Sequence, residues 1–111
     1  MIVGIGIDVV EVARIERAMQ NPRFVRRILC EEERAEGLSA GRVAGRWAAK
    51  EALAKALGRS LRWHQVCVAN DDYGRPTLRV EGVAELAGCR VHLTITHERS
   101  VAAAVVVIER G

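Results

Sequence analysis

Apolar residues recur along this 111-residue chain at two spacings, and these spacings divide it into strands and helices. Alternating or continuous apolar runs predict strands at 2–8, 64–70, 76–80, 90–96 and 101–109. A repeat of three to four residues predicts helices at 9–20, 23–38 and 40–57, with a short helix at 81–89. The helical segment 23–38 is expected to break near Cys30, before an acidic turn at Glu31–Glu33.

Local signals agree with these boundaries. Asn21 and Pro22 offer an N-cap followed by a proline at the first helical position. The helix at 40–57 is rich in Ala, Leu, Lys and Glu, and it is followed by Gly58, a typical C-cap residue. The segment NDDYGRP, residues 70–76, has the composition of a turn. Because the strand at 101–109 is apolar on both faces, we expect it to be a central strand. The whole pattern predicts one α+β domain spanning residues 1–111.

Composition narrows the class of protein. Half of the residues are hydrophobic but only 4% are aromatic, so the core must be built mainly from Val, Ile, Leu and Ala. No apolar run approaches the roughly 20 residues of a membrane helix. The amino terminus lacks the basic region of a signal peptide, and a cytoplasmic protein is expected. The net charge of +3 favours an acidic partner: nucleic acid, a phosphorylated small molecule or an acidic protein.

The three cysteines, Cys30, Cys67 and Cys89, are widely spaced and odd in number. They form no CxxC pair and no Cys/His spacing suited to zinc. The sequence therefore predicts buried free thiols rather than disulfides or metal ligands.

Asp8 is the first candidate for chemistry, because it ends an apolar strand that contains two glycines. A carboxylate in that place can hold a ligand rigidly. It can equally serve as the N-cap of a helix that begins at Val9. Position alone leaves both interpretations open.

The segment RWAAKEALAKALG, residues 46–58, is the second candidate. It contains both lysines of the chain, Lys50 and Lys55, around the carboxylate of Glu51. On a helix, Trp47, Glu51 and Lys55 form one stripe. The stripe is either a solvated ion pair worth about 0.2–0.5 kcal/mol or a partly covered functional face. Asp8 and Glu51 together would offer two hard oxygen ligands to Mg²⁺, with Lys55 close enough to reach the same phosphates.

Histidines add one further candidate. His97 stands at the end of a strand, where binding residues are common. His64 and His92 are interpreted as structural. The segment 70–76 is interpreted as a plain turn.

Several of these segments resemble, in order and spacing, the bacterial holo-[acyl-carrier-protein] synthases, which are short 4′-phosphopantetheinyl transferases. The matching segments are GIGIDVVEVARIER, RFVRRILCEEE, GRWAAKEALAKALG, DDYGRPTLRV and LTITHE, and they cover nearly the whole chain. The resemblance implies a small antiparallel sheet packed with a long central helix. It also implies transfer of 4′-phosphopantetheine from coenzyme A to a serine of apo-acyl carrier protein, with adenosine 3′,5′-bisphosphate as the other product.

The resemblance further implies roles for single residues. Asp8 and Glu51 match the positions of the family's Mg²⁺ ligands. Glu51 and Lys55 are the candidates for proton transfer. Arg46, Lys50, Lys55 and His97 match positions around the coenzyme A phosphates. The chain departs from the family pattern at Trp47, Cys30 and Glu98. The resemblance also implies a homotrimer with active sites between subunits.

An acidic carrier protein also gives a role to the early arginines. Arg14, Arg26 and Arg27 are expected to dock it. The alternative interpretation, a small basic nucleic-acid-binding module, rests on the arginine count alone.

Overall fold

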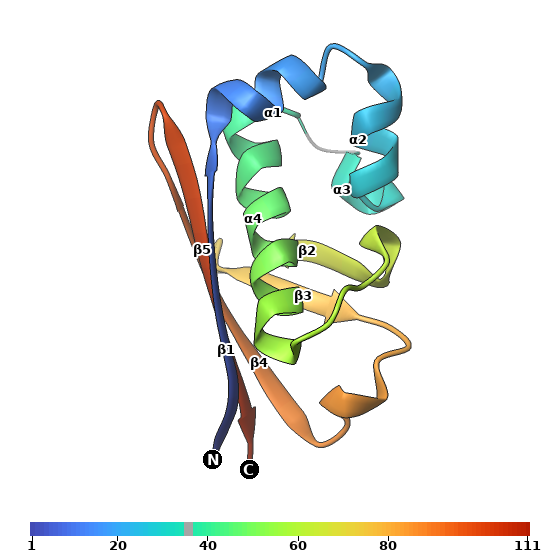
Figure 1. The fold of residues 1–111 in the computed structure, drawn as a ribbon, viewed down its shortest axis with the longest axis vertical. Coiled ribbons are helices and arrows are strands. Elements are labelled where there is room, and N and C mark those ends of the chain that lie inside the picture. The colour runs from blue at the N-terminus through green and yellow to red at the C-terminus, as the bar shows by residue number, and fades with distance from the viewer. Residues whose placement is uncertain (35–36) are drawn as a thin grey trace.

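The computed structural model describes residues 1–34 and 37–111 and has the α+β composition that the sequence predicts. Figure 1 shows its elements in space. In chain order they are β1 (Ile2–Glu11), α1 (Val12–Ala18), α2 (Pro22–Ile28), α3 (Glu31–Arg34), α4 (Ala40–Leu57), the 3₁₀ turn η1 (Trp63–Gln65), β2 (Val66–Asn70), β3 (Pro76–Val80), the 3₁₀ turn η2 (Ala84–Leu86), β4 (Cys89–His97) and β5 (Val101–Arg110).

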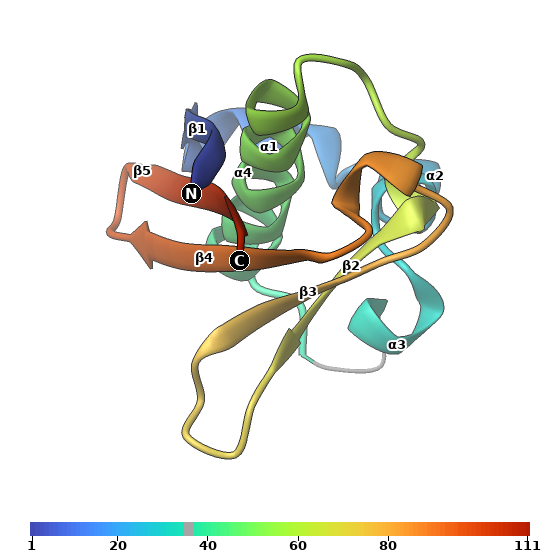
Figure 2. The same ribbon diagram turned by 90° about the horizontal axis from the view of Figure 1, so that it is seen from below.

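The main sheet is antiparallel, in the order β1-β5-β4, and α4 packs across one face of it (Figure 2). β5 is central, as its apolar sequence predicts. Its inward residues are fully or almost fully buried against α4; they are Ala102, Ala104, Val106 and Ile108. β2 and β3 form a separate two-stranded hairpin beside β4. The predicted α+β fold with a long helix on a small antiparallel sheet is confirmed.

Two glycines allow β1 to lie unusually close to α4. A Cβ atom at Gly6 would stand 2.0 Å from the carbonyl oxygen of Ala52, and one at Gly4 would stand 2.4 Å from that of Ala56. Both contacts are with helix backbone, which cannot turn aside as a side chain can. Because alternate residues of a strand share a face, Asp8 faces α4 together with the two glycines.

We expect Gly6→Ala to lower the free energy of unfolding by about 1–3 kcal/mol, because β1 must move away from α4. Denaturant unfolding measures this change. Gly37→Ala is the matched control, since a Cβ there meets nothing within 4 Å. Equal stability of the two variants would contradict the close approach of β1 and α4.

The first helix begins later than predicted. Residues 9–11 continue β1, with Val9 opposite Ala103 and Glu11 opposite Val101. Asp8 therefore lies inside the strand rather than at its end, and Glu11, not Asp8, is the N-cap residue of α1. Pairing with β5 has overridden the helical spacing of this short β-branched segment.

Most other boundaries follow the sequence closely, except that residues 64 and 65 of the strand predicted at 64–70 belong to η1. Asn21 and Ser39 cap α2 and α4 by accepting from the backbone N–H groups of Arg23 and Arg42. Gly58 ends α4 in the left-handed conformation, at φ 77°. The helical segment 23–38 breaks into α2 and α3 around Cys30, although its residues 35–36 lie outside the described part of the chain. The short helix predicted at 81–89 is the 3₁₀ turn η2.

The prediction for the cysteines is wrong in one respect. Cys30 and Cys67 form a disulfide, and only Cys89 is free. The turn between α2 and α3 lies against the start of β2, which brings the two Cα atoms to 5.8 Å. This separation lies within the range that a disulfide spans.

Candidate active site

Asp8 reaches the flank of α4 from the inner face of β1. Its side chain is only 14% exposed, and its Oδ1 accepts a hydrogen bond from Lys55 Nζ at 3.0 Å. The same ammonium group also donates to the carbonyl oxygen of Ile7. The structure therefore brings Asp8 and Lys55 together as the sequence predicts.

Glu51 lies on the same flank of α4, one turn before Lys55. Burial raises the pKa of Glu51, and the negative charge of Asp8 raises it further, while Lys55 and Arg14 act in the opposite direction. Asp8 and Glu51 are thus close enough to repel each other. They are also held on two different rigid elements.

This donor set fits a hard divalent cation. Two half-buried carboxylates that repel each other are stabilised when a cation lies between them, and Mg²⁺ commonly takes one or two carboxylates together with phosphate oxygens and water. The Lys55 side chain is 55% exposed, so it can leave Asp8 and move toward an added anion.

Lys50 lies on the interior side of α4. Its Nζ is 2.6 Å from Glu33 Oε1 and 2.6 Å from the carbonyl oxygen of Ile28, and both ionic side chains are almost fully buried. Burial lowers the pKa of Lys50, although the hydrogen bond to Glu33 opposes this shift. The placement does not support the predicted phosphate contact of Lys50. Its ammonium instead ties α3 to α4, one residue away from Glu51.

A hollow of about 230 Å³ opens where α4, β4 and the β2–β3 turn meet. His97 packs there against Gly41, whose Cβ position would be 3.2 Å from His97 Nδ1. Arg46 also lines the hollow, and its Nη1 donates to the carbonyl oxygen of Glu33 at 2.9 Å. The remaining lining residues are Gly41, Arg42, Gly45, Val68, Asn70, Gly74, Pro76 and Ile95.

The β2–β3 turn therefore does more than reverse the chain. Asn70, Gly74 and Pro76 form one wall of the hollow that His97 and Arg46 line, whereas the sequence predicts only a turn for this segment. The turn itself is well built: Asp71 Oδ1 accepts from the backbone N–H groups of Tyr73 and Arg75. The other two histidines have structural partners as predicted, since His64 Nε2 donates to the Arg26 carbonyl and His92 Nε2 lies 3.0 Å from Glu109 Oε1.

The three predicted docking arginines are exposed on α1 and α2. Arg14 lies over the ring of Trp47, at 5.7 Å, and its charge also acts on Glu51. Trp47 packs in turn between Phe24 and Trp63, with ring centroids 5.8 and 4.7 Å away. This aromatic row partly covers the Trp47 face of α4, which agrees with the second of the two interpretations of the sequence stripe. Arg14 thus borders the carboxylate site, whereas Arg26 and Arg27 belong to the surface of α2.

Asp8, Glu51 and Lys55 offer groups that could hold a divalent cation and a phosphate, and the hollow lined by Arg46 and His97 offers further groups that could bind an anion. A family model described as the 4′-phosphopantetheinyl transferase superfamily matches residues 4–106. The holo-[acyl-carrier-protein] synthase of Geobacillus sp. (strain WCH70) is 46% identical over 121 residues, which cover 99% of this chain and 98% of that protein.

Solved structures agree with the sequence comparison. A holo-(acyl-carrier-protein) synthase from Bacillus anthracis, in complex with CoA (3′,5′-ADP), has a TM-score of 0.88 and 42% identity, over 100% of this chain and 99% of that one. The holo-[acyl-carrier-protein] synthase from Neisseria meningitidis has a TM-score of 0.89 and 33% identity, over 99% and 100%. The class is therefore a transferase. The chain belongs to the 4′-phosphopantetheinyl transferase superfamily, in its holo-[acyl-carrier-protein] synthase family.

Within the described ranges, no helix combines the length and apolar character needed to cross a membrane.

Proposed function

We propose that this enzyme transfers the 4′-phosphopantetheine group of coenzyme A to a serine hydroxyl of apo-acyl carrier protein and releases adenosine 3′,5′-bisphosphate. The observation that carries the proposal is the approach of Asp8, on β1, to the flank of α4 that carries Glu51, with Lys55 Nζ 3.0 Å from Asp8 Oδ1. The names of the relatives and the bound CoA (3′,5′-ADP) of the Bacillus anthracis structure support it.

In this proposal Asp8 and Glu51 hold Mg²⁺. The ion, when bound, neutralises charge that develops on the phosphate oxygens. Lys55 turns from Asp8 to the same phosphates as a compact cation. His97, Arg42 and Arg46 line the hollow that takes the phosphorylated nucleotide end of coenzyme A.

The serine oxygen forms a bond to the β-phosphorus of coenzyme A, and the bond from that phosphorus to the bridging oxygen breaks. Adenosine 3′,5′-bisphosphate leaves with the bridging oxygen. The hydroxyl proton passes to Glu51, directly or through water. Lys55 lies close enough to assist this transfer.

The function is tested by incubating the enzyme with apo-acyl carrier protein, coenzyme A and Mg²⁺, followed by intact-mass spectrometry of the carrier. We expect the mass to rise by one phosphopantetheine group, with one adenosine 3′,5′-bisphosphate released for each carrier modified. A carrier whose acceptor serine is replaced by alanine is the negative control, and EDTA should stop the reaction. An unchanged mass of a folded carrier would overturn the proposal.

Assembly into a homotrimer is part of the proposed function. The large apolar side chains that are most exposed among the described residues all belong to the amino-terminal segment, except Tyr73; they are Met1, Ile2, Val3, Ile5, Ile7 and Val9. β1 is also an edge strand, which pairs only with β5 in the described sheet. Exposed apolar side chains along an edge strand are typical of a surface that another protein chain covers.

The two halves of the candidate site support a shared arrangement. At 100° per residue, Glu51 and Lys55 lie on the flank of α4 beyond β1, whereas Arg42 and Arg46 lie on the opposite flank, toward β4. These flanks correspond to opposite edges of the β1-β5-β4 sheet. A neighbouring copy that covers β1 can bring its own hollow to Asp8 and Glu51. Coenzyme A would then bind between two subunits.

Docking of the carrier protein is best tested on α2. We expect the double reversal Arg26→Glu and Arg27→Glu to raise KM for the carrier protein about 10-fold and to leave KM for coenzyme A unchanged, because the contact is made with one substrate only. KM of the wild type should also rise with salt. Steady-state kinetics at varied carrier and coenzyme A measures both constants.

Arg110→Glu is the control for charge reversal, because Arg110 is the last residue of β5 and the carboxyl terminus lies far from α2 (Figure 1). Arg14→Glu is less suitable as a docking test, because the charge of Arg14 also acts on Glu51. Equal increases in both KM values for the α2 double variant would count against a docking role.

A further inference from the structure

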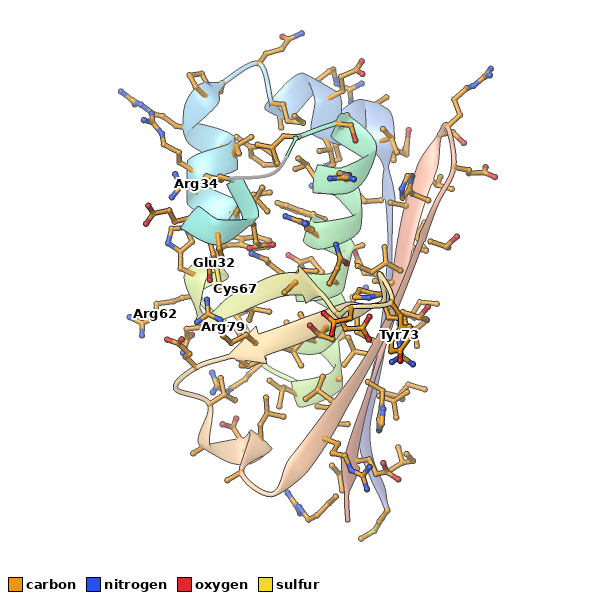
Figure 3. The ribbon with its side chains drawn as sticks, turned by 180° about the vertical axis from the view of Figure 1, so that it is seen from behind. Glu32, Arg34, Arg62, Cys67, Tyr73 and Arg79 are labelled. Atoms are coloured by element: carbon orange, nitrogen blue, oxygen red, sulfur yellow. A yellow bond between two sulfur atoms is a disulfide. The ribbon has the colours of Figure 1, made fainter. Side chains whose placement is uncertain are left out.

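The proposed reaction leaves the Cys30–Cys67 pair without a role. Glu32 lies beside it, and a carboxylate oxygen of Glu32 and the two Sγ atoms all lie within 4.8 Å of one another. Figure 3 shows Glu32, Cys67 and Arg79 gathered where α3 meets β2 and β3. The chain thus places two cysteine sulfurs and one carboxylate together, although they come from α3, the turn before it, and β2.

A backbone carbonyl oxygen also lies close to both sulfurs. The carbonyl oxygen of His64 lies 3.7 Å from Cys30 Sγ and 3.8 Å from Cys67 Sγ. Around a tetrahedral zinc ion with Zn–S near 2.3 Å and Zn–O near 2.1 Å, neighbouring ligand atoms stand about 3.5–3.8 Å apart. The distances from both sulfurs to this oxygen already fall in that range. Once the S–S bond is broken, rotation of the two side chains can bring the sulfurs to the same spacing from each other.

We propose that Cys30, Cys67 and Glu32 form a thiol site with two states: a disulfide when oxidised, and a binding site for a zinc-class divalent cation when reduced. The His64 carbonyl oxygen or a water molecule supplies the fourth ligand. The site is separate from Asp8 and Glu51, which offer only hard oxygen ligands. Thiolates select zinc-class metals over Mg²⁺.

The interconversion balances with one co-reactant. A dithiol reductant gives two electrons and two protons to the disulfide and becomes a disulfide itself, which leaves Cys30 and Cys67 as thiols. The cation then displaces both thiol protons into solvent and binds two thiolates and the Glu32 carboxylate. The cytoplasm, where the sequence predicts this enzyme to work, keeps thiols reduced. The reduced state, which can bind the cation, is therefore the one expected there.

The surroundings permit entry and ligand exchange. The two cysteines are 4–5% exposed, but the Glu32 side chain is 53% exposed and forms the outer wall. Glu32 is ion-paired with Arg79, which also pairs with Glu81. Arg79 consequently keeps a carboxylate partner when Glu32 turns to the cation.

The disulfide and the cation-bound site would hold the same part of the fold in place. The backbone N–H of Cys30 donates to Glu33 Oε1, and this oxygen also binds Lys50, the residue before Glu51. A link between Cys30 and Cys67, through a bond or through a cation, holds the α2–α3 turn on β2. It thereby keeps the buried Glu33–Lys50 pair in place behind the candidate active site.

Co²⁺ is a suitable probe, because cobalt–thiolate bonds absorb in the near ultraviolet. The purified enzyme is reduced with a phosphine, which does not supply competing thiols, and is titrated with Co²⁺. We expect a thiolate-to-cobalt band that saturates at one ion per chain and disappears on addition of Zn²⁺. The oxidised enzyme should show no band. Zn²⁺ should also raise the melting temperature of the reduced enzyme.

Variants separate this site from adventitious binding. Cys89→Ser removes the remaining free thiol and should leave the titration unchanged. Cys30→Ser and Cys67→Ser should abolish the band, and Glu32→Gln should weaken Co²⁺ binding about 10-fold or more. No band in the reduced wild type, or a full band in Cys30→Ser, would overturn the proposal. Should the cysteine variants fail to fold, an unchanged affinity in Glu32→Gln would overturn the three-ligand site. None of these readouts uses coenzyme A or a carrier protein, so they are independent of the proposed function.

Discussion

Glu51→Gln and Asp8→Asn are each expected to lower kcat about 100-fold or more, while the protein remains folded. Each amide keeps the shape of the side chain but removes the charge that would hold Mg²⁺, and an amide in place of Glu51 could no longer accept a proton. Stability should not fall for Glu51→Gln. Because the pKa of Glu51 is raised in the folded protein, its ionised form disfavours folding at neutral pH, and the neutral amide relieves that cost.

Transfer is measured as holo-carrier formed per enzyme at saturating coenzyme A and carrier, and folding as the thermal midpoint. Glu85→Gln is the matched control. Glu85 also forms an ion pair, with Arg59 at 2.6 Å, but it lies on η2 at the surface. The Glu85→Gln variant should be as active as the wild type. Full activity of either site variant at limiting Mg²⁺ would remove Asp8 and Glu51 from the proposed metal site.

Local signals explain which parts of the fold could be predicted from the sequence. Helix α4 is bounded by Ser39 and Gly58, each of which acts on backbone groups within three or four residues. The approach of Asp8 to α4 could also be anticipated in outline, because a strand places Asp8 on the same face as Gly6. The point at which β1 ends and α1 begins could not be predicted. Whether Val9 and Val10 join a strand or a helix depends on β5, which lies more than 90 residues later.

Long-range partners explain what the sequence left undetermined. Lys50 resembles any other helix lysine until the fold places Glu33, 17 residues away, against it. The 37-residue separation of Cys30 and Cys67 carries no information about their distance in space. The hollow beside His97 could not be predicted from the sequence for a similar reason. Asn70, Gly74 and Pro76 are ordinary turn residues, and only the packing of the hairpin against α4 and β4 gives them a second role.

Ala103→Glu is expected to separate the proposed trimer and, with it, to abolish transfer. Ala103 lies on the outer face of β5, directly opposite Val9 of β1. Within one subunit the new carboxylate would point away from the core, so the subunit itself should stay folded. In a trimer that covers this face, the charge would lose its water, at a cost of several kcal/mol per ion. The dissociation constant of the assembly should therefore rise about 100-fold or more.

Sedimentation at assay concentrations measures the assembly, and the transfer assay is run on the same sample. Ala87→Glu introduces the same side chain at an exposed position after η2, and it should leave both assembly and activity unchanged. Glu51 and Lys55 face one edge of the sheet, and Arg42 and Arg46 face the other. In the proposed arrangement, a single subunit would therefore offer coenzyme A only one half of the site at a time. Loss of assembly should then lower activity even though every site residue is intact. A wild-type enzyme that is fully active while it sediments as a monomer would show that one chain is sufficient.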